Sequence, residues 1–249
     1  MDLNGAVAVV TGGSGGLGGR ICHSLAAAGA KVAVLYDQGR EKAENLVDEL
    51  VAGGSVAKAI HCDVTDPDKV DAMVAQVLTS FGRLDILVND AGYNKWIPFD
   101  DIDALTYADW NKLIDVNLTG PMLTIKAASR PMKAQGGGRI VNISSVAGIT
   151  PTGSSIGYAV AKSGLIHLTK CMAVGLAPDI LVNCISPGYL EGTKMSMNLA
   201  PKYQKAAVEG SLLQRAADKD DIARQVVAFC ATDSITGQTL AIDSGRVFH

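Results

Sequence analysis

Short runs of apolar residues alternate along the chain with longer stretches in which apolar residues recur at helical spacing. Gly, Asn, Asp or Ser closes each run, as is typical of the ends of strands. The runs are apolar at successive positions, which is typical of strands buried on both faces of a parallel sheet. Strands are predicted at Ala6–Val10, Val32–Tyr36, Ala57–Cys62, Ile86–Val88, Ile140–Ile143, Leu181–Ile185 and Leu240–Ile242.

Helical spacing fills the stretches between these runs. The clearest examples are Glu41–Leu50, Lys69–Phe81, Leu118–Met132, Ala159–Ala173 and Ile222–Cys230. Repeated strand–helix units favour an α/β fold, a doubly wound seven-stranded parallel sheet with helices on both faces. No linker or internal repeat interrupts the pattern, so residues 1–249 are predicted to form one domain.

Composition narrows the classes of function. Glycine makes up 27 of 249 residues and hydrophobic residues make up 48%, which excludes a disordered chain. The net charge of −3 offers no basic field for nucleic acid. The first residues show no leader pattern, and no run reaches the ~18 apolar residues of a membrane span. A cytoplasmic protein with no nucleic-acid or membrane partner is therefore expected.

The cysteines and histidines suggest neither disulfides nor a metal. The five cysteines are widely spaced, without a C-x-x-C pair, and are expected to be reduced thiols in the core. The histidines have no spacing that would form a metal site, so no metal is predicted.

A glycine-rich loop directly follows the first predicted strand. Its sequence is Thr11-Gly-Gly-Ser-Gly-Gly-Leu-Gly18, and a helical segment begins at Gly19. In such a loop the backbone turns tightly against a pyrophosphate, whose charge lies at the helix N-terminus. Asp37 stands 19 residues after Gly18, at the end of the second strand, where a carboxylate that binds the ribose is expected. The spacing predicts a dinucleotide site.

A second constellation offers proton-transfer chemistry. Tyr158 and Lys162 stand four residues apart in a helical segment and so share one face, and Ser145 precedes Tyr158 by 13 residues. A carbonyl that accepts hydride becomes an alkoxide, so it needs a proton donor within reach. Tyr158 can supply that proton. We expect Lys162 to bring the pKa of the phenol about three units toward neutrality, roughly 4 kcal/mol.

With these residues in place, the sequence resembles the short-chain dehydrogenase/reductase family over nearly the whole chain. The motifs that carry the resemblance are T-G-x-x-x-G-x-G at 11–18, Asp63-Val64, Asn89-Asp90-Ala91-Gly92, Asn117, Ser145, Tyr158 with Lys162, and Pro187-Gly188. The resemblance implies a Rossmann-type sheet and hydride transfer with NAD or NADP. It also implies a homotetramer in which helices corresponding to Leu118–Met132 and Ala159–Ala173 pack across two-fold axes.

The resemblance also implies roles for individual residues. Lys162 holds the nicotinamide ribose, Ser145 positions the substrate oxygen, and Asn117 orders a water that passes protons to Lys162. Three positions depart from the family pattern: Asp90 stands for a usual Asn, Gly192 for a usual Thr, and Ser244 for the first Gly of a usual D-G-G. Cofactor contacts are expected at Gly12, Ser14, Gly16, Leu17, Gly18, Tyr36, Asp37, Asp63, Val64, Asp90, Gly92, Tyr158, Lys162, Pro187 and Gly188.

Two segments follow the ends of predicted strands, where ligands bind in such sheets: residues 93–98, and residues 189–213, which we call the lid segment. Trp96, Tyr189 and Met195 are expected to line an apolar pocket there. The first interpretation is an enzyme that interconverts ketones and secondary alcohols on small to medium, mostly apolar substrates. The alternatives are reduction of 3-oxoacyl thioesters on acyl carrier protein and a non-catalytic dinucleotide sensor, although a sensor need not retain Tyr158 and Lys162.

The cofactor is not decided by one residue. Asp37 favours NAD, because its carboxylate would accept hydrogen bonds from the ribose and repel the extra phosphate of NADP. Arg40 is close enough in sequence to reach that phosphate. NAD is expected, and NADP stays open.

Overall fold

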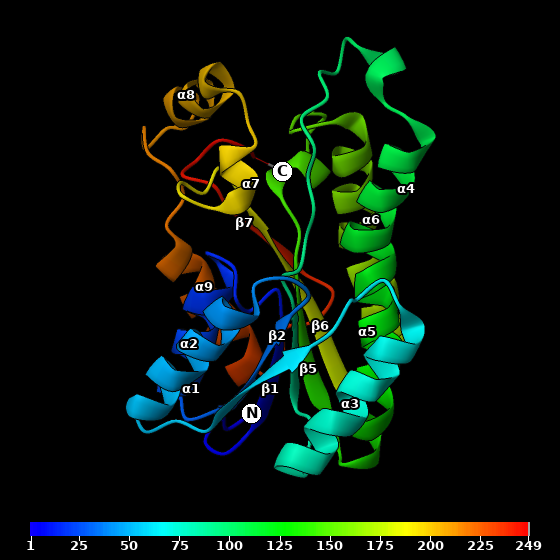
Figure 1. Cartoon of the computed structure of the whole chain (residues 1–249), viewed down its shortest axis with the longest axis vertical. Helices are drawn as coiled ribbons and strands as arrows, with labels where there is room; N and C mark the ends of the chain where they lie inside the picture. Colours follow the sequence, from blue (N-terminus) through cyan, green and yellow to red (C-terminus); the bar gives the residue numbers. More distant parts are fainter. Residues whose placement is uncertain (249) are drawn as a thin grey trace.

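A central sheet of parallel strands forms the middle layer of the computed structural model, which describes residues 1–248 (Figure 1). The strand order is β3-β2-β1-β4-β5-β6-β7, and every neighbouring pair is parallel. This confirms the predicted α/β, Rossmann-type fold. The strands are β1 Val7–Thr11, β2 Lys31–Tyr36, β3 Ala57–His61, β4 Ile86–Asn89, β5 Gly138–Ile143, β6 Ile180–Pro187 and β7 Thr239–Ile242.

Helices cover both faces because successive strand residues point to opposite sides. In β1, Ala8 and Val10 belong to one core cluster and Val7 and Val9 to the other. The first cluster includes residues of α1 (Gly18–Ala27), α2 (Arg40–Ala52) and α9 (Lys219–Ala231). The second includes residues of α3 (Pro67–Phe81), of α5 (Gly120–Ala134) and of the C-terminal end of α6 (Ile156–Leu176).

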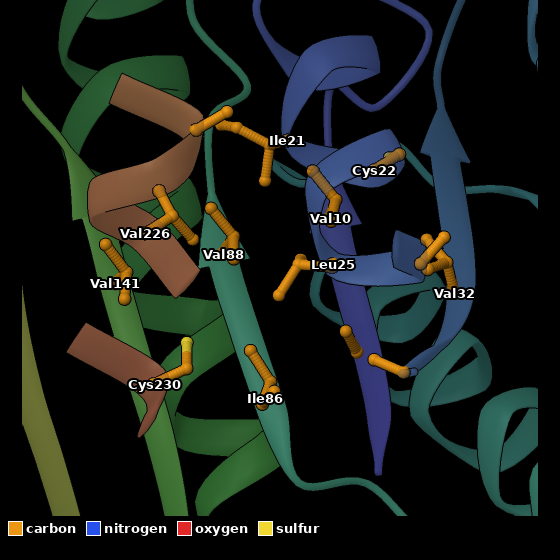
Figure 2. Packing of buried hydrophobic residues seen from close by; sticks show 14 of the residues in the cluster. Val10, Ile21, Cys22, Leu25, Val32, Ile86, Val88, Val141, Val226 and Cys230 are labelled. Atoms are coloured by element: carbon orange, nitrogen blue, oxygen red, sulfur yellow. The ribbon is translucent and has the colours of Figure 1, made fainter. Parts of the chain in front are cut away.

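Figure 2 shows the first cluster from close by. Ile21 and Leu25 of α1 and Val226 of α9 lie over Val10 and Val88, which belong to the two strands at the centre of the sheet. All five side chains are fully buried. The glycine loop that connects β1 to α1 is therefore held between two well-packed elements.

The order of the strands reverses between β1 and β4. From β1 the chain proceeds outward through β2 and β3, and it returns to the other side of β1 as β4. Parallel sheets bind ligands in the crevice beyond the carboxyl ends of strands at such a reversal. There the hydroxyl of Thr11 accepts hydrogen bonds from the backbone N–H groups of Asp90 and Ala91, both at 3.0 Å. The two halves of the crevice are thus joined by one side chain.

A chain of buried polar side chains ties α5 and α6 to the sheet. Thr124 donates to Oδ1 of Asn89 at 2.7 Å, Asn89 donates to Asn142 at 2.9 Å, and Asn142 donates to Thr169 at 2.9 Å. Each of the four side chains is at most 2% exposed. Because Thr169 lies on α6, this chain sets the position of the helix that carries Tyr158 and Lys162.

Some elements differ from the sequence predictions. The helix expected to begin at Leu118 is preceded by α4 (Tyr107–Ile114) and by a wide helical turn at Asp115–Thr119, and α5 begins at Gly120. The lid segment contains two helices, α7 (Lys194–Met197) and α8 (Pro201–Glu209). Short 3₁₀ turns at Ile102–Ala104 and Val146–Gly148 complete the elements of the described chain.

The expected core cysteines require one correction. Cys22, Cys62, Cys184 and Cys230 are buried, whereas Cys171 is exposed because it lies on the outer side of α6. Within residues 1–248, no helix is long and apolar enough to cross a membrane. The same residues contain no cluster of three or more His, Cys, Asp or Glu side chains that could hold a metal ion.

Candidate active site

A cavity of about 540 Å³ opens at the carboxyl ends of the strands. It runs from the glycine loop and the end of β2, past Tyr158 and Lys162, to the lid segment. Of the residues predicted to contact a cofactor, the cavity is lined by Gly12, Ser14, Gly16, Leu17, Tyr36, Asp37, Asp63, Val64, Asp90, Gly92, Tyr158, Lys162, Pro187 and Gly188. Gly18 does not line it.

The glycine loop has the shape that a dinucleotide needs. Gly12 adopts a left-handed conformation with φ of +64°, and its carbonyl accepts a hydrogen bond from the N–H of Gly15 at 2.8 Å. A Cβ on Gly18 would lie 2.3 Å from that carbonyl oxygen, which a side chain cannot do. The loop therefore closes tightly against the first turn of α1, and its N–H groups can face a pyrophosphate. On this observation the residues fit a dinucleotide cofactor.

Tyr158 is placed by the start of α6. Ser155 caps the helix by accepting a hydrogen bond from the N–H of Tyr158 at 3.2 Å, which sets the phenol in the first turn. Ser145 follows β5 and lines the cavity together with Tyr158, and its hydroxyl acts to lower the pKa of the phenol. The phenol also contacts Sδ of Met195 in the lid at 3.9 Å. The sheet, α6 and the lid thus meet at one hydroxyl group.

Lys162 lies one turn further along α6 and is 2% exposed. Its ammonium group donates to the carbonyl oxygen of Ile143 at 2.9 Å and lies 5.8 Å from the centre of the Tyr158 ring. Burial lowers the pKa of Lys162 to about 8, and the nearby carboxyl of Asp90 opposes this shift. The site thus contains an ammonium group that loses its charge within the range of a pH titration.

The expectation that Lys162 lowers the pKa of Tyr158 is wrong for this structure. Burial raises the pKa of Tyr158 to about 12; the hydrogen bond with Ser145 works against this shift, and Asp90 adds to it. Desolvation of the phenolate is the largest cause, and the ammonium group of Lys162 donates to Ile143 instead. Tyr158 is therefore protonated at neutral pH.

Asp90, which stands for the usual Asn, is a half-buried acid between the glycine loop and Lys162. Burial raises its pKa to about 8, while Lys162 and a hydrogen bond from the backbone N–H of Gly18 oppose the rise. The cofactor contact expected at Gly18 stays a prediction. Asp90 adds a second group that titrates beside Lys162.

Asn117 lies in the wide helical turn and is fully buried. Its amide group donates to the carbonyl oxygens of Tyr93 and Leu113, both at 2.8 Å, and its Oδ1 accepts from the N–H of Tyr93 at 3.2 Å. One amide hydrogen therefore holds the segment after β4, and the other bonds back to α4. The water relay expected at Asn117 stays a prediction.

The lid segment closes the cavity through polar contacts with the rest of the chain. Asn94 donates to the carbonyl oxygen of Met195 at 3.0 Å, and Asn198 donates to Asn94 at 2.9 Å. The hydroxyl of Tyr203 accepts from the N–H of Gly153 at 2.9 Å. These bonds place α7 and α8 over Tyr158.

Two of the three predicted substrate residues line the cavity. Tyr189 and Met195 do so, but Trp96 does not, because its ring packs edge-on against Tyr203 at 5.1 Å between centroids and Tyr203 forms the wall in its place. This corrects the expectation for Trp96. Tyr203 is a further lining residue, and no motif distinguished it from the other residues of the lid segment.

Two further residues bear on the site, Ser144 and Arg246. The buried hydroxyl of Ser144 donates to the carbonyl oxygen of Lys162 at 2.8 Å and so holds α6 against β5. Arg246 lines the cavity from the segment after β7. No motif marked Arg246, because its placement depends on contacts distant in sequence.

Asp37 and Tyr36 line the other end of the cavity. The carboxylate of Asp37 lies 3.9 Å from Nε2 of His61 and is largely exposed. Arg40, the competing residue for a phosphate, is paired with Glu44 at 2.7 Å and does not line the cavity.

The fold and this set of residues together define a dinucleotide-dependent oxidoreductase. A glycine cradle, a protonated phenol, a serine hydroxyl and an ammonium group share one cavity at the reversal of a parallel sheet.

Comparison with known proteins agrees with this class. The model of the short chain dehydrogenase family matches residues 6–204. A 3-oxoacyl-[acyl-carrier-protein] reductase from Synechocystis sp. is 38% identical over 98% of both chains. A 3-alpha-(or 20-beta)-hydroxysteroid dehydrogenase from Mycobacterium bovis is 35% identical over 98% of this chain and 90% of its own. A solved NADPH-dependent 3-quinuclidinone reductase from Rhodotorula rubra has a TM-score of 0.89 at 27% identity, covering 98% of this chain and 92% of its own. The chain belongs to the short-chain dehydrogenase/reductase family.

The titration of Lys162 predicts how the rate of carbonyl reduction depends on pH. The charge of Lys162 is present below its pKa of about 8 and is lost above it, so kcat for reduction should fall as pH rises through about 8. Asp90→Asn removes a carboxylate that favours the charged form, so the fall should move to lower pH. Initial rates at saturating cofactor between pH 6 and 9.5 measure both. A flat wild-type profile, or a shift to higher pH in the variant, contradicts the assignment.

Proposed function

We propose that the protein interconverts ketones and secondary alcohols of small to medium, mostly apolar substrates, with NAD as cofactor. The placement of Tyr158, Ser145 and Lys162 around one cavity, with the ammonium group 5.8 Å from the centre of the Tyr158 ring, carries this proposal. Tyr189, Leu190, Met195 and Leu199 supply an apolar wall on the lid side. A dinucleotide sensor would have no use for the catalytic residues, which here line one cavity.

Ser145, Tyr158 and Lys162 have separate roles in carbonyl reduction. A bound nicotinamide cofactor supplies the hydride. Ser145 and Tyr158 present hydroxyl groups to the substrate oxygen, and the raised pKa of Tyr158 keeps its proton available at neutral pH. The ammonium group of Lys162 stabilises the phenolate that remains after the proton is given up. For alcohol oxidation Tyr158 must first lose its proton, so at neutral pH the protonation state of Tyr158 suits catalysis of reduction better than catalysis of oxidation.

A panel of neutral ketones, assayed by absorbance with NADH and with NADPH, tests this proposal. Wild type should reduce members of the panel, and Tyr158→Phe should lower kcat by at least the ~10²-fold typical of the loss of a general acid. The ring volume is kept, so the Kd for cofactor should change little. A Tyr158→Phe enzyme with most of its turnover would remove Tyr158 from the mechanism.

Reduction of 3-oxoacyl thioesters is the second candidate. The Synechocystis relative carries that name. In addition α5 exposes Lys126, Arg130 and Lys133 on one face, and none of them has a salt bridge within residues 1–248. Such a stripe suits an acidic carrier protein. Against this, residues 175–179, which run from the end of α6 toward β6, include no Lys or Arg. Val174, directly before them, is 83% exposed and apolar.

Comparison of the same 3-oxoacyl group on acyl carrier protein and on a short soluble thiol distinguishes the two candidate functions. If the thioester is the substrate, kcat/KM for a 3-oxoacyl group on acyl carrier protein should exceed that for the same group on a short soluble thiol, and Arg130→Glu should lower it at least tenfold. Our proposal expects similar values for both thioesters and no effect of Arg130→Glu. A strong preference for the carrier that this substitution removes would establish the second candidate.

The expectation of NAD is supported by the surroundings of Asp37. Asp37 lines the cavity. Arg40, which could bind the ribose phosphate of NADP, instead donates to Glu44 and does not line the cavity. A phosphate on the ribose would therefore meet a negative charge. The solved Rhodotorula reductase is NADPH-dependent, so the same fold also serves NADPH.

Replacement of Asp37 tests the choice of cofactor. Asp37→Ser should raise the ratio of NADP to NAD efficiency at least tenfold, about 1.4 kcal/mol. Steady-state kcat/KM values for both cofactors with one ketone give the ratio. An unchanged ratio, or a wild-type preference for NADPH, would show that Asp37 does not face the ribose.

We further propose a homotetramer in the cytoplasm. An apolar groove of about 360 Å³ lies between α6 and the start of α5 with the turn before it. The same surface of a second copy can pack against it across a two-fold axis. The groove is lined by Leu118, Thr119, Met122, Gly164, His167, Leu168 and Cys171. All five cysteines are free, as suits a reducing compartment.

Light scattering tests the assembly. Wild type should show about four times the chain mass of 25.8 kDa, and Leu168→Glu should yield smaller species because it places a charge in the groove. Val174→Glu, on the same helix outside the groove, is the matched control and should leave the mass unchanged. A wild-type monomer at micromolar concentration refutes the tetramer.

A further inference from the structure

The segment after β7 is a built turn. The carboxylate of Asp243 accepts hydrogen bonds from the N–H of Gly245 at 2.9 Å and from the N–H of Val247 at 2.7 Å. Asp243 is 8% exposed. These bonds fix the backbone on both sides of Arg246.

The turn is also fastened to its surroundings. Leu212 and Leu213, at the end of the lid segment, donate backbone hydrogen bonds to the carbonyl oxygens of Gly245 and Ser244 at 3.2 and 3.0 Å. Asp243 packs so closely on the end of β6 that a Cβ on Gly188 would lie 2.7 Å from its Cα. The backbone of Arg246 is therefore held between the catalytic edge of the sheet and the lid.

From this turn the side chain of Arg246 reaches the wall of the cavity and is half-buried there. Within residues 1–248 no carboxylate lies within salt-bridge distance of it. Three lysines also line the cavity: Lys162 is buried and donates to Ile143, and Lys112 and Lys194 are exposed. Arg246 thus presents a guanidinium with free donors to the cavity.

The acidic residues of the cavity lie elsewhere. Asp37 follows β2, Asp63 follows β3, and Asp90 lies against the glycine loop. The lid side, between Tyr189 and Ala207, contributes no carboxylate to the lining. A guanidinium in such surroundings binds a carboxylate best, through two parallel hydrogen bonds.

We propose that Arg246 determines specificity by binding a carboxylate carried by the substrate. This inference rests on the proposed function and names its substrate class, a keto acid whose body is apolar. The reacting carbonyl lies at Tyr158 and Ser145, the apolar body lies along Met195 and Leu199, and the carboxylate meets Arg246.

The phosphates of the cofactor are the other possible source of negative charge. The glycine loop and the start of α1 already provide a site for them, whereas the Arg246 turn is bonded to the lid. Accordingly, Arg246→Gln should leave the Kd for NADH within twofold of wild type.

Matched substrates test the proposal. A series of aliphatic keto acids, with different numbers of methylene groups between carbonyl and carboxylate, is compared with the corresponding methyl esters. For at least one spacing, wild type should favour the acid at least tenfold in kcat/KM. Arg246→Gln should reduce this ratio at least tenfold, chiefly through KM, and Arg246→Lys should restore part of it.

Arg215→Gln is the control for net charge, because Arg215 is exposed and does not line the cavity. It should leave the ratio of acid to ester unchanged. The proposal is overturned if no spacing gives a preference for the acid, if Arg246→Gln leaves the ratio intact, or if Arg246→Gln weakens NADH binding tenfold.

Failure of the proposed function is distinguishable from these outcomes. If wild type reduces neither acid nor ester with either cofactor, calorimetric binding of the same pairs decides the inference. Tighter binding of the acid that is lost in Arg246→Gln supports the carboxylate site, and equal binding of acid and ester overturns it.

Discussion

Hydrogen bonds between side chains that water cannot reach determine where α6 lies against the sheet. Asn89 of β4, Asn142 of β5 and Thr169 of α6 form a chain in which each donor meets an acceptor. Each bond contributes only about 1 kcal/mol net, but a buried partner left unpaired costs about 1–3 kcal/mol. Other placements of the helix are thereby penalised. The positions of Tyr158 and Lys162 relative to β5 follow from this constraint.

The same burial shapes the charge of the site. Tyr158, Lys162 and Asp90 lie where ionised forms are poorly solvated, and each pKa shifts toward the neutral form. The phenol consequently holds its proton more firmly than it would in water. The ammonium and carboxyl groups both titrate near pH 8, so protons can be exchanged among groups that are close in energy.

Local pattern was sufficient to predict the seven strands and several of the helices. The apolar runs located the strands to within a few residues because strands buried on both faces leave an unbroken signal. The spacing of Tyr158, Lys162 and Ser145 selected the reactive groups because it depends on one helix and one strand end. These predictions require no knowledge of how distant segments pack.

Features that depend on distant segments could not be predicted in this way. Trp96 turns toward Tyr203, Met195 reaches the phenol, and Arg246 is held by Asp243 and by the end of the lid. The pKa of Tyr158 reflects how completely the fold buries it, which sequence spacing does not report. The wide turn at Asn117 likewise interrupts a stretch that reads as one helix.

The manner in which the lid is attached bears on how this enzyme could diversify. Contacts such as Asn94 with Met195 and Gly153 with Tyr203 are single hydrogen bonds, whereas the glycine loop is enclosed between fully buried strands and α1. Mutations in the lid therefore remove little of the core. New substrate ranges can arise by drift in residues 189–213 while the sheet and the loop are inherited unchanged, and laboratory evolution of new activities can be confined to the same segment.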